Sequence, residues 1–599
     1  MPKVAPRAPA PSSDNVVRWL DFTPDVFALA RAENKLVLLD LEAVWCHWCH
    51  VMAEDTYKDA EVAKLLGRNY LCVRVDQDAR PDLSNRYEQY GWPATIVFAA
   101  NGQELLKNAG YISPQAMRKI LQDTVSLAKK RPTATSAASS SSSSGEKNSG
   151  GGGEEFAVLS PSLKAALIKR HKDGCDTKYG GWGSYQKFLD FDSAEFAMSL
   201  GLAGDKDEIG QARAALDGEL NLLDPAFGGL YQYSTDGDWK HPHFEKVMAI
   251  QADGLRLYSL GFLLYKDPKY LEAAKSIAAY LSEFLIGPEG AFYTSQDADL
   301  RPGEHSVEYF ALGREERLKV GLPRIDRHIY SRENGLAASA LTYLYRASRD
   351  PAYLERAIKA VDWVEANRSI SASPGGYRHD AADTAGPYLG DNLAMGRAFL
   401  ALYEVTGERA WLEKARASAD FIDRHFQIDG RRGFVTAAPN AVMPTFAPQP
   451  LLDENVSLSR FFNLLYHYTG TQSYHDQSLR ALRYLSQPDT YNQRRIFVSG
   501  ILLADGEAQN TPLHVTVSGG KADAQAGALF AEAIALPVLY KRTEWWDDKE
   551  GPLPNSHVQV PVLPRAAAFS CGAGRCSRPA YTPDDLLRMV TRLAASNQP

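Results

Sequence analysis

Two cysteines and two histidines stand within five positions of the chain, in the stretch Cys46-His47-Trp48-Cys49-His50. They follow an apolar run, residues 36–43, that reads as a buried strand, so the cysteines fall at the start of the next helix. A thiol at a helix N-terminus meets the positive end of the helix dipole, which lowers its pKa and raises its thiolate fraction. Cys46 is therefore the predicted nucleophile of a redox pair, and Cys49, one turn further on, is the predicted resolving thiol.

Two neighbouring groups would assist this chemistry. Asp40 lies in the buried strand and is a candidate proton carrier for the step in which Cys49 attacks the mixed disulfide. His47 lies between the cysteines, where it would stabilise the thiolate and make the pair more oxidising. We predict thiol-disulfide exchange with protein thiols or disulfides, with no cofactor and no metal ion.

Three other interpretations of the same residues stay open at this point. Cys-x-x-Cys-His is the signature of covalent haem attachment, which needs export and an axial ligand. Cys46, Cys49 and His50 could bind zinc or an iron-sulfur cluster together with a remote ligand. The third alternative is a redox-inactive fold that serves for docking.

Composition excludes some partners of this chain. The 599 residues carry a formal charge of −7 and a pI near 6.1, so no general basic field attracts nucleic acid or an anionic membrane. No run of about eighteen apolar residues occurs, and the first fifteen residues lack the apolar core of a secretory signal. We expect no nucleic-acid or membrane partner and a cytoplasmic location.

Strand and helix patterns alternate in the first part of the chain. Helical spacing is found in residues 22–35, 50–69 and 113–130, and strands are expected in 36–43, in 70–78 and on both sides of an Asn101-Gly102 turn. This order resembles thioredoxin, with Trp45 just before the first cysteine and Pro93 before the hairpin. The resemblance implies that Pro93 is cis and packs beside the disulfide, while the histidines of the motif depart from the family pattern.

After residue 128, the composition and the predicted secondary structure change twice. Residues 129–157 contain six consecutive serines and four consecutive glycines, which predicts a disordered linker with a reach of roughly 30 Å. Residues 158–540 show helices in pairs, joined by loops such as "YGGWGSY" and "SPGGYRHD". Such an internal repeat predicts an (α/α)6 barrel of six helical hairpins. The expected pairs are 161–172 with 191–203, 209–223 with 245–265, 268–285 with 330–348, 352–366 with 390–406, 409–425 with 455–470, and 474–487 with 523–540.

The loops at one end of this barrel would line a central cleft. Acidic and polar groups there are candidates for acid, base or hydrogen-bonding roles toward a sugar, and aromatic rings are candidates for stacking on it. The alternative is that these groups cap helices and fill the barrel. The candidate substrate-binding residues are His243, Glu245, Asp297, Asp299, Asp391, Asn392, Trp182 and Tyr233.

Both halves together resemble one family. The pieces "CHWCHVM", "VDQDARPDL", "YGWPATIVF", "HFEKVM" and "SQDAD" occur in the order found in the spermatogenesis-associated thioredoxin-like proteins. The resemblance implies a multidomain chain, with an α/β thioredoxin-like domain joined to an all-α six-hairpin barrel similar to glycosidases and N-acylglucosamine epimerases. We expect a thioredoxin-like domain at 15–128, the linker at 129–157, the barrel at 158–540 and a tail at 541–599.

Two readings of the whole chain follow. The first is a thiol-disulfide redox protein, with a barrel that binds a carbohydrate or another substrate. The alternative is a carbohydrate-active isomerase, epimerase or hydrolase, in which the thioredoxin-like domain regulates or docks. Near the end, Cys571 and Cys576 are separated by four residues, two of them glycines, which lets them form a labile disulfide. We predict that this second pair exchanges electrons with Cys46 and Cys49.

Overall fold

The computed structural model describes residues 17–23, 25–130, 158–382, 385–430, 432–438, 446–555, 557, 559–572 and 575–596. Residues 131–157, which make up most of the predicted linker, lie outside this description. The chain forms two compact units, each described here by itself. The first comprises Met1–Gly151 together with Asp299–Ser306, and the second comprises Gly152–Ala298 and Val307–Pro599. No helix in the described residues is long and apolar enough to cross a membrane.

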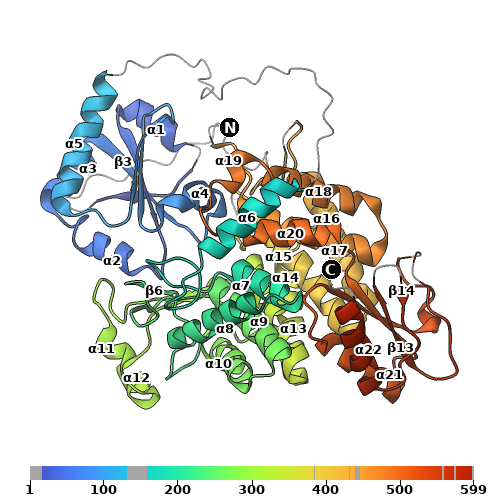
Figure 1. Ribbon diagram of the computed structural model, residues 1–599. Helices are drawn as coiled ribbons and strands as arrows, with labels where there is room; N and C mark the ends of the chain where they lie inside the picture. Colours follow the sequence, from blue (N-terminus) through green and yellow to red (C-terminus); the bar gives the residue numbers. More distant parts are fainter. Residues whose placement is uncertain are drawn as a thin grey trace. The chain divides into compact units, whose positions relative to one another are not determined.

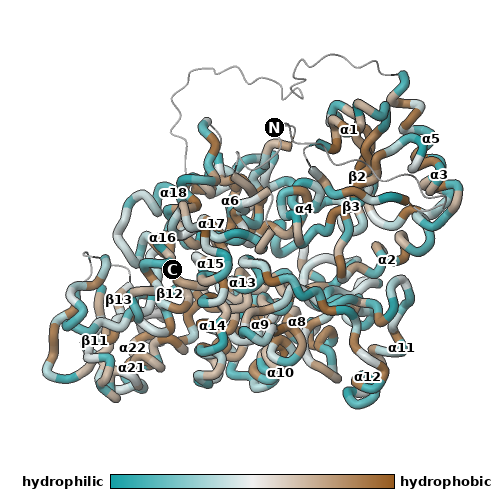
Figure 2. Tube along the Cα trace, turned by 180° about the vertical axis from the view of Figure 1, so that it is seen from behind, coloured by the Kyte–Doolittle hydropathy of each residue, from teal (hydrophilic) through white to brown (hydrophobic). Residues whose placement is uncertain are grey.

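The first unit is built on a five-stranded sheet in the order β1-β3-β2-β4-β5. β1 (Trp19–Leu20) and β2 (Leu36–Glu42) run parallel to β3 (Tyr70–Asp76), whereas β4 (Ala94–Phe98) runs antiparallel to β2 and to β5 (Glu104–Ala109). The central strands are apolar and buried, as the brown colour along β2 and β3 shows in Figure 2. β2 therefore lies at the centre of the sheet and ends where the cysteine motif begins.

Helices cover both faces of this sheet. Figure 1 shows α3 (Ala60–Asn69) and α5 (Pro114–Lys130) together on one side, and these two helices contact each other. α1 (Val26–Glu33) joins β1 to β2, and α4 (Pro81–Tyr87) follows β3. The helix predicted over 50–69 is instead two helices, because the Asp59 side chain accepts hydrogen bonds from the backbone N–H groups of Glu61 and Val62 and caps α3. The first piece, α2 (His47–Glu54), carries the cysteine motif.

The second unit contains the predicted (α/α)6 barrel, and the predicted fold class is confirmed. Its inner helices are α7 (Phe191–Leu202), α9 (Met248–Tyr265), α13 (Ser331–Ser348), α15 (Leu389–Thr406), α17 (Leu452–Thr469) and α20 (Ser499–Gln509). Each contacts the next in this order, and α20 contacts α7, which closes the ring. The outer helices are α6 (Pro161–Asp173), α8 (Lys206–Glu219), α10 (Pro268–Phe284), α14 (Pro351–Arg368), α16 (Arg409–His425) and α18 (Gln472–Leu485).

Glycine pairs in the loops before the inner helices have a packing reason. A Cβ added at Gly228, which has a φ of +74°, would lie 2.4 Å from the backbone oxygen of Ser276 on α10. A Cβ at Gly375, with a φ of +83°, would lie 2.1 Å from the oxygen of Ala417 on α16. The repeated glycines therefore let each loop lie directly against the backbone of an outer helix.

The last predicted hairpin differs from the structure. Residues 524–535 form α21 (Ala524–Ala535), which packs on β11 (Leu513–Ser518) and β13 (Ala567–Gly572) instead of completing the barrel. The sixth inner helix is α20, which was expected to be a loop. The region expected as a tail adds β12 (Lys541–Trp546), β14 (Arg575–Cys576) and α22 (Pro583–Ser596), and the sheet order is β12-β11-β13-β14.

Candidate functional site

The cysteine pair lies at the start of α2 in the first unit. Cys46 is the N-cap residue, and its Sγ accepts a hydrogen bond from the backbone N–H of Cys49 at 3.1 Å. The two residues form a disulfide, with their Cα atoms 5.3 Å apart, and both are buried. In the reduced protein, the same helix N-terminus and N–H donor would stabilise a Cys46 thiolate. The pair thus has the geometry that thiol-disulfide exchange requires.

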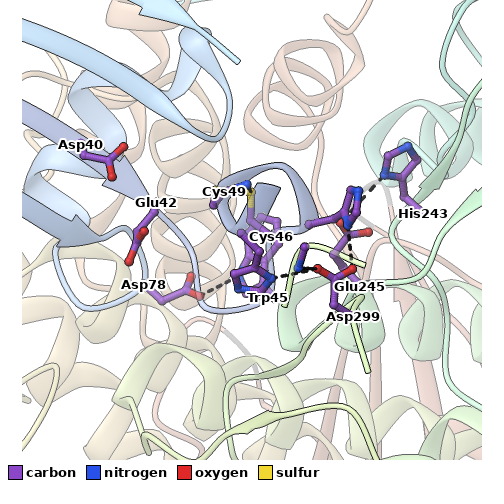
Figure 3. Close-up of a disulfide and its surroundings, with 12 residues drawn as sticks. Asp40, Glu42, Trp45, Cys46, Cys49, Asp78, His243, Glu245 and Asp299 are labelled. Carbon is purple, nitrogen blue, oxygen red and sulfur yellow. Dashed lines mark hydrogen bonds and ion pairs between the residues drawn. A yellow bond between two sulfur atoms is a disulfide. The ribbon is translucent and has the colours of Figure 1, made fainter. Parts of the chain in front are cut away.

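Two carboxyl groups of β2 lie near this pair and share one arginine. Arg74 Nη2 lies 3.0 Å from Asp40 Oδ2, and Arg74 Nε lies 3.2 Å from Glu42 Oε2. Figure 3 shows Asp40, Glu42 and the disulfide in this order along β2 and the turn after it. Burial, more than the charge of Asp40, raises the pKa of Glu42 to about 7, and burial also raises the pKa of Asp40. Asp40 was the predicted proton carrier, and Glu42 is a second candidate that the sequence analysis missed.

Two other features of the expected redox site are present. The Trp92-Pro93 peptide bond is cis, as the resemblance to thioredoxin implied for Pro93. The Trp45 indole N–H donates to Asp78 Oδ2 at 2.8 Å, which fixes the residue before the first cysteine (Figure 3).

Asp299 does not lie where the sequence analysis expected it. It was predicted to belong to the barrel cleft, but by its contacts it belongs to the first unit. Its Oδ1 lies 2.7 Å from Nδ1 of His47, and its Oδ2 lies 3.1 Å from Nδ1 of His50. Asp299 is therefore part of the surroundings of the cysteine motif.

Several predicted barrel residues do come together in the second unit. The Tyr233 ring stacks on the His243 ring, with centroids 4.3 Å apart, and Nδ1 of His243 lies 3.9 Å from Oε1 of Glu245. The antiparallel pairing of β8 (Lys246–Val247) with β9 (Ser295–Gln296) brings Glu245 and Asp297 to the same end of the ladder. Glu245 is buried, and its Oε2 has no hydrogen-bond partner among the described residues. Tyr233, His243, Glu245 and Asp297 thus form a cluster of aromatic and acidic side chains of the kind found in polar binding sites.

Three other predicted residues have structural contacts. Asn392, the fourth residue of α15, accepts the Tyr377 N–H at 2.8 Å and donates to the Tyr388 oxygen at 2.7 Å. Asp391 Oδ1 accepts the backbone N–H of Arg332 at 2.9 Å, and its carboxylate also contacts His379. Trp182 is 1% exposed and donates its indole N–H to the oxygen of His171, so its ring is not open for stacking on a ligand.

The contact made by Asn392 is repeated around the barrel. In α9, α13 and α17 the side chain of the fourth residue, Gln251, Asn334 or Asn455, binds the backbone N–H and C=O of one residue in an earlier loop, which is Leu230, Phe292 or Phe434. Asn392 does the same with Tyr377, whose oxygen lies 3.4 Å from its amide nitrogen. The side-chain amide binds both the N–H and the C=O of that loop residue, so the extended loop gains the hydrogen bonds that it lacks in its own backbone. Asn392 is thus one of four equivalent braces.

The inner helices form a charged cluster that was not predicted from the sequence. Glu195 of α7 accepts from Arg256 of α9 at 2.8 Å and from Arg460 of α17 at 2.6 Å. Arg460 also donates to Glu507 of α20 at 2.7 Å. Because these helices form the ring, their meeting point lies inside it. The signal that could have found the cluster is the presence of charged residues within the otherwise apolar stretches of inner helices.

Two further carboxyl groups, Asp192 and Asp253, lie at this cluster, and no salt bridge shorter than 3.8 Å is found for either among the described residues. Asp192 Oδ1 lies 3.8 Å from Arg460 Nη1, and its side chain is 30% exposed. Burial raises the pKa of Asp192 to about 7 and that of Asp253 to about 6, although nearby arginines oppose the shift. Near neutral pH, Asp192 can therefore both donate and accept a proton.

The second cysteine pair also forms a disulfide. Cys571 and Cys576 face each other across the β13–β14 pair, with their Cα atoms 4.0 Å apart. Cys576 is exposed. The bridge that the glycine-containing turn predicted is thus present, and its exchange with Cys46 and Cys49 stays a prediction.

Among the comparisons with known proteins, the family match supports the thioredoxin-like fold of the first unit most directly. Residues 10–140 match the family model Thioredox_DsbH, described as a protein of unknown function, DUF255. Spermatogenesis-associated protein 20 of Mus musculus is 27% identical over 312 residues, which cover 48% of this chain and 39% of that protein. The thiol:disulfide interchange protein DsbD of Campylobacter jejuni is 27% identical over 96 residues, or 15% of this chain and 17% of that protein. The predicted resemblance is confirmed, and the chain matches well under half the length of these relatives.

Solved structures resemble the helical part. A D-mannose isomerase has a TM-score of 0.47 at 14% identity, covering 60% of this chain and 99% of that one. A sugar epimerase from a ruminal bacterium has a TM-score of 0.45 at 12% identity, covering 57% of this chain and 96% of that one. At these scores the comparison carries no argument about activity.

Proposed function

We propose that Cys46 and Cys49 carry out thiol-disulfide exchange with protein thiols or disulfides. The observation that carries this proposal is the bridged pair at the N-terminus of α2, with Cys46 as the N-cap residue. The bridged sulfurs at a helix N-terminus support a redox role better than a metal-binding one.

In the reducing direction, the Cys46 thiolate attacks one sulfur of a substrate disulfide, and the other substrate sulfur leaves as a thiolate. The Cys49 thiolate then attacks the Cys46 sulfur, which breaks the mixed disulfide and releases the second substrate thiolate. Two electrons pass to the substrate, and the Cys46–Cys49 bond forms. Asp40 or Glu42 takes the proton of Cys49, and Glu42 is the better acceptor near neutral pH because its pKa is about 7. The reverse sequence oxidises a dithiol.

Alkylation and mass spectrometry of the full chain test this proposal. We expect Cys46 and Cys49 to resist alkylation after mild oxidation and to react after treatment with a dithiol. Cys46→Ser should abolish reduction of a disulfide-bonded substrate protein, whereas Cys72→Ser, which removes a buried free thiol of β3, should not. If both thiols of the motif stay free under oxidant while zinc or iron copurifies in stoichiometric amount, the redox proposal is wrong.

We also propose that the barrel binds a polar ligand, with carbohydrate as the first class to test. The charged cluster inside the ring supports this, because interior carboxyl groups without a close partner cost stability unless a ligand uses them. Asp192 and Asp253 are the candidate acid-base pair, and His243, Glu245, Asp297 and Tyr233 are the candidate rim of the site. If the bound sugar is also turned over, the alternative reading as a carbohydrate-active enzyme applies.

A thermal-shift panel of sugars tests the barrel proposal. A ligand at 100 times its dissociation constant adds about 2.7 kcal/mol to the stability of the folded state. Asp192→Asn should remove the shift of any active sugar and should not lower the unliganded melting temperature, because burial raises the pKa of Asp192 to about 7 and ionisation of this buried carboxyl costs stability. Asp362→Asn on the exposed face of α14 is the matched control. A flat panel, or a shift that survives Asp192→Asn, would contradict this site.

A further inference from the structure

The first unit contains a short segment from a distant part of the sequence. Residues Asp299–Ser306 belong to it, although 252 positions separate Asp299 from His47. The segment closes on itself, because the Asp299 Oδ2 accepts the Gly303 N–H at 2.8 Å and the Ser306 hydroxyl accepts the Leu300 N–H at 2.9 Å. Asp299 is 2% exposed. The carboxylate is thus held in one position by its own loop.

This carboxylate bridges both histidines of the cysteine motif. His47 lies between Cys46 and Cys49, and His50 follows Cys49 directly. Although burial opposes it, hydrogen bonds from His47 and His50 lower the pKa of Asp299 to about 2, so the group is ionised near neutral pH. An ionised carboxylate only accepts hydrogen bonds, so Nδ1 of each imidazole must carry the proton.

Other groups also face the histidines in this unit. The His305 ring packs against the His47 ring, with centroids 4.1 Å apart. The charge of Glu42 interacts with that of His50. Glu54 lies beside the same loop, since a Cβ added at Gly303 would lie 3.5 Å from its Cγ. Of these groups, Asp299 is the carboxylate that lies within hydrogen-bonding distance of both the His47 and the His50 imidazole.

An anion in this place has two opposite effects on the Cys46 thiolate. Acting directly, a negative charge near the thiolate destabilises it. Acting through the imidazoles, it fixes their orientation, and an imidazole held beside a thiolate stabilises it by hydrogen bonding or by positive charge. The hydrogen bonds at 2.7 Å and 3.1 Å join the carboxylate directly to both imidazoles, so the geometry provides the route for the second effect.

We infer that Asp299 is a positioning residue of the redox pair, which acts through His47 and His50 to stabilise the reduced, thiolate form of Cys46. This inference rests on the proposed function and adds a residue that the contiguous thioredoxin-like sequence does not contain. Asp299 sets how strongly the pair oxidises its partners.

Asp299→Asn in the full-length protein tests this role. The amide keeps the shape of the side chain but removes its charge and presents an N–H₂ group in place of one acceptor oxygen. We expect about three- to tenfold less Cys46 thiolate near pH 7 than in the wild type. The rate of iodoacetamide alkylation against pH, read on the Cys46 peptide, measures this fraction. The equilibrium constant with glutathione should shift by a similar factor toward the disulfide, about 30 mV for a tenfold change.

The sign of the change separates the possible roles. More thiolate in Asp299→Asn would show that the carboxylate acts only as a bare charge, and an unchanged thiolate fraction would show a purely structural contact. Either result overturns the inference. Glu304→Gln, an exposed substitution in the same segment, is the matched control and should change neither readout.

A double-mutant comparison identifies the route through the histidines. Replacing His47 and His50 together by Asn should also lower the thiolate fraction, and Asp299→Asn in that background should no longer lower it. If the histidine variant raises the fraction, the inference fails even when Asp299→Asn proves too unstable to titrate. Failure of the proposed function is seen separately, because the wild-type pair would then not equilibrate with glutathione at all.

Discussion

Replacing Asn392 by leucine tests whether this residue braces the barrel or binds a ligand. Leucine has a similar volume but can neither accept the Tyr377 N–H nor donate to the Tyr388 oxygen, which now have partners at 2.8 Å and 2.7 Å. Asn392 is fully buried, so both hydrogen bonds would be lost away from water. Each such loss costs about 1–3 kcal/mol, which predicts a destabilisation of about 2–6 kcal/mol for the two together.

Calorimetric melting of the full chain measures this change. The barrel transition should move to lower temperature in Asn392→Leu, and the equivalent Asn334→Leu should behave alike because it removes the same brace from α13. Asn367→Leu, at an exposed position of α14, provides the control. If Asn392→Leu melts like the wild type and instead loses a sugar-induced shift, Asn392 binds a ligand, as the sequence predicted, and does not brace the barrel.

Two further predictions concern the redox chemistry. The pKa of Glu42 is raised to about 7 in the folded state, so its contribution to stability is present below about pH 4.5 and is lost as the pH rises through 7. Relative to Glu42→Gln, the free energy of unfolding of the wild-type first unit should fall by about 2–3 kcal/mol over this pH range. Hydrogen exchange of the β2 amides, corrected for intrinsic rates, measures this change. If the two proteins give parallel curves of stability against pH, the pKa of Glu42 is not raised. In Cys49→Ser, which lacks the resolving thiol, we expect a mixed disulfide between Cys46 and Cys571 or Cys576, and peptide maps with only small-thiol or foreign-protein adducts would exclude the relay.

The first unit could be predicted well because its signals are local. The apolar strand, the cysteine spacing and the Asn101-Gly102 turn each determine structure within a few residues, and the structure has β2, α2 and the β4–β5 hairpin at these places. The break between α2 and α3 was missed because the apolar spacing continues through it. Asp59 decides the break as a helix cap, and a single capping residue is a weaker signal than a periodic pattern.

The sixth inner helix was missed for a physical reason that also involves the charged cluster. α20 contains Gly500 at its second position, which reads as part of a loop. A Cβ at Gly500 would lie 2.2 Å from Oδ2 of Asp192, so the glycine makes room for that carboxylate. Gly500 thus both makes α20 look like a loop in the sequence and leaves space for the Asp192 carboxylate inside the ring.

The contact between Asp299 and the histidines could not be predicted, because no local pattern connects residues that are 252 and 249 positions apart. The motif "SQDAD" was instead grouped with the barrel, where its neighbour Asp297 does lie. Two acidic residues separated by a single alanine thus belong to different compact units. The consequence for function is direct, because a fragment that ends at residue 128 contains every residue of the cysteine motif but lacks the carboxylate that holds both of its histidines. Chemistry measured on such a fragment would describe Cys46 without Asp299, so the reduction potential of the intact site has to be measured on a chain that includes residues 299–306.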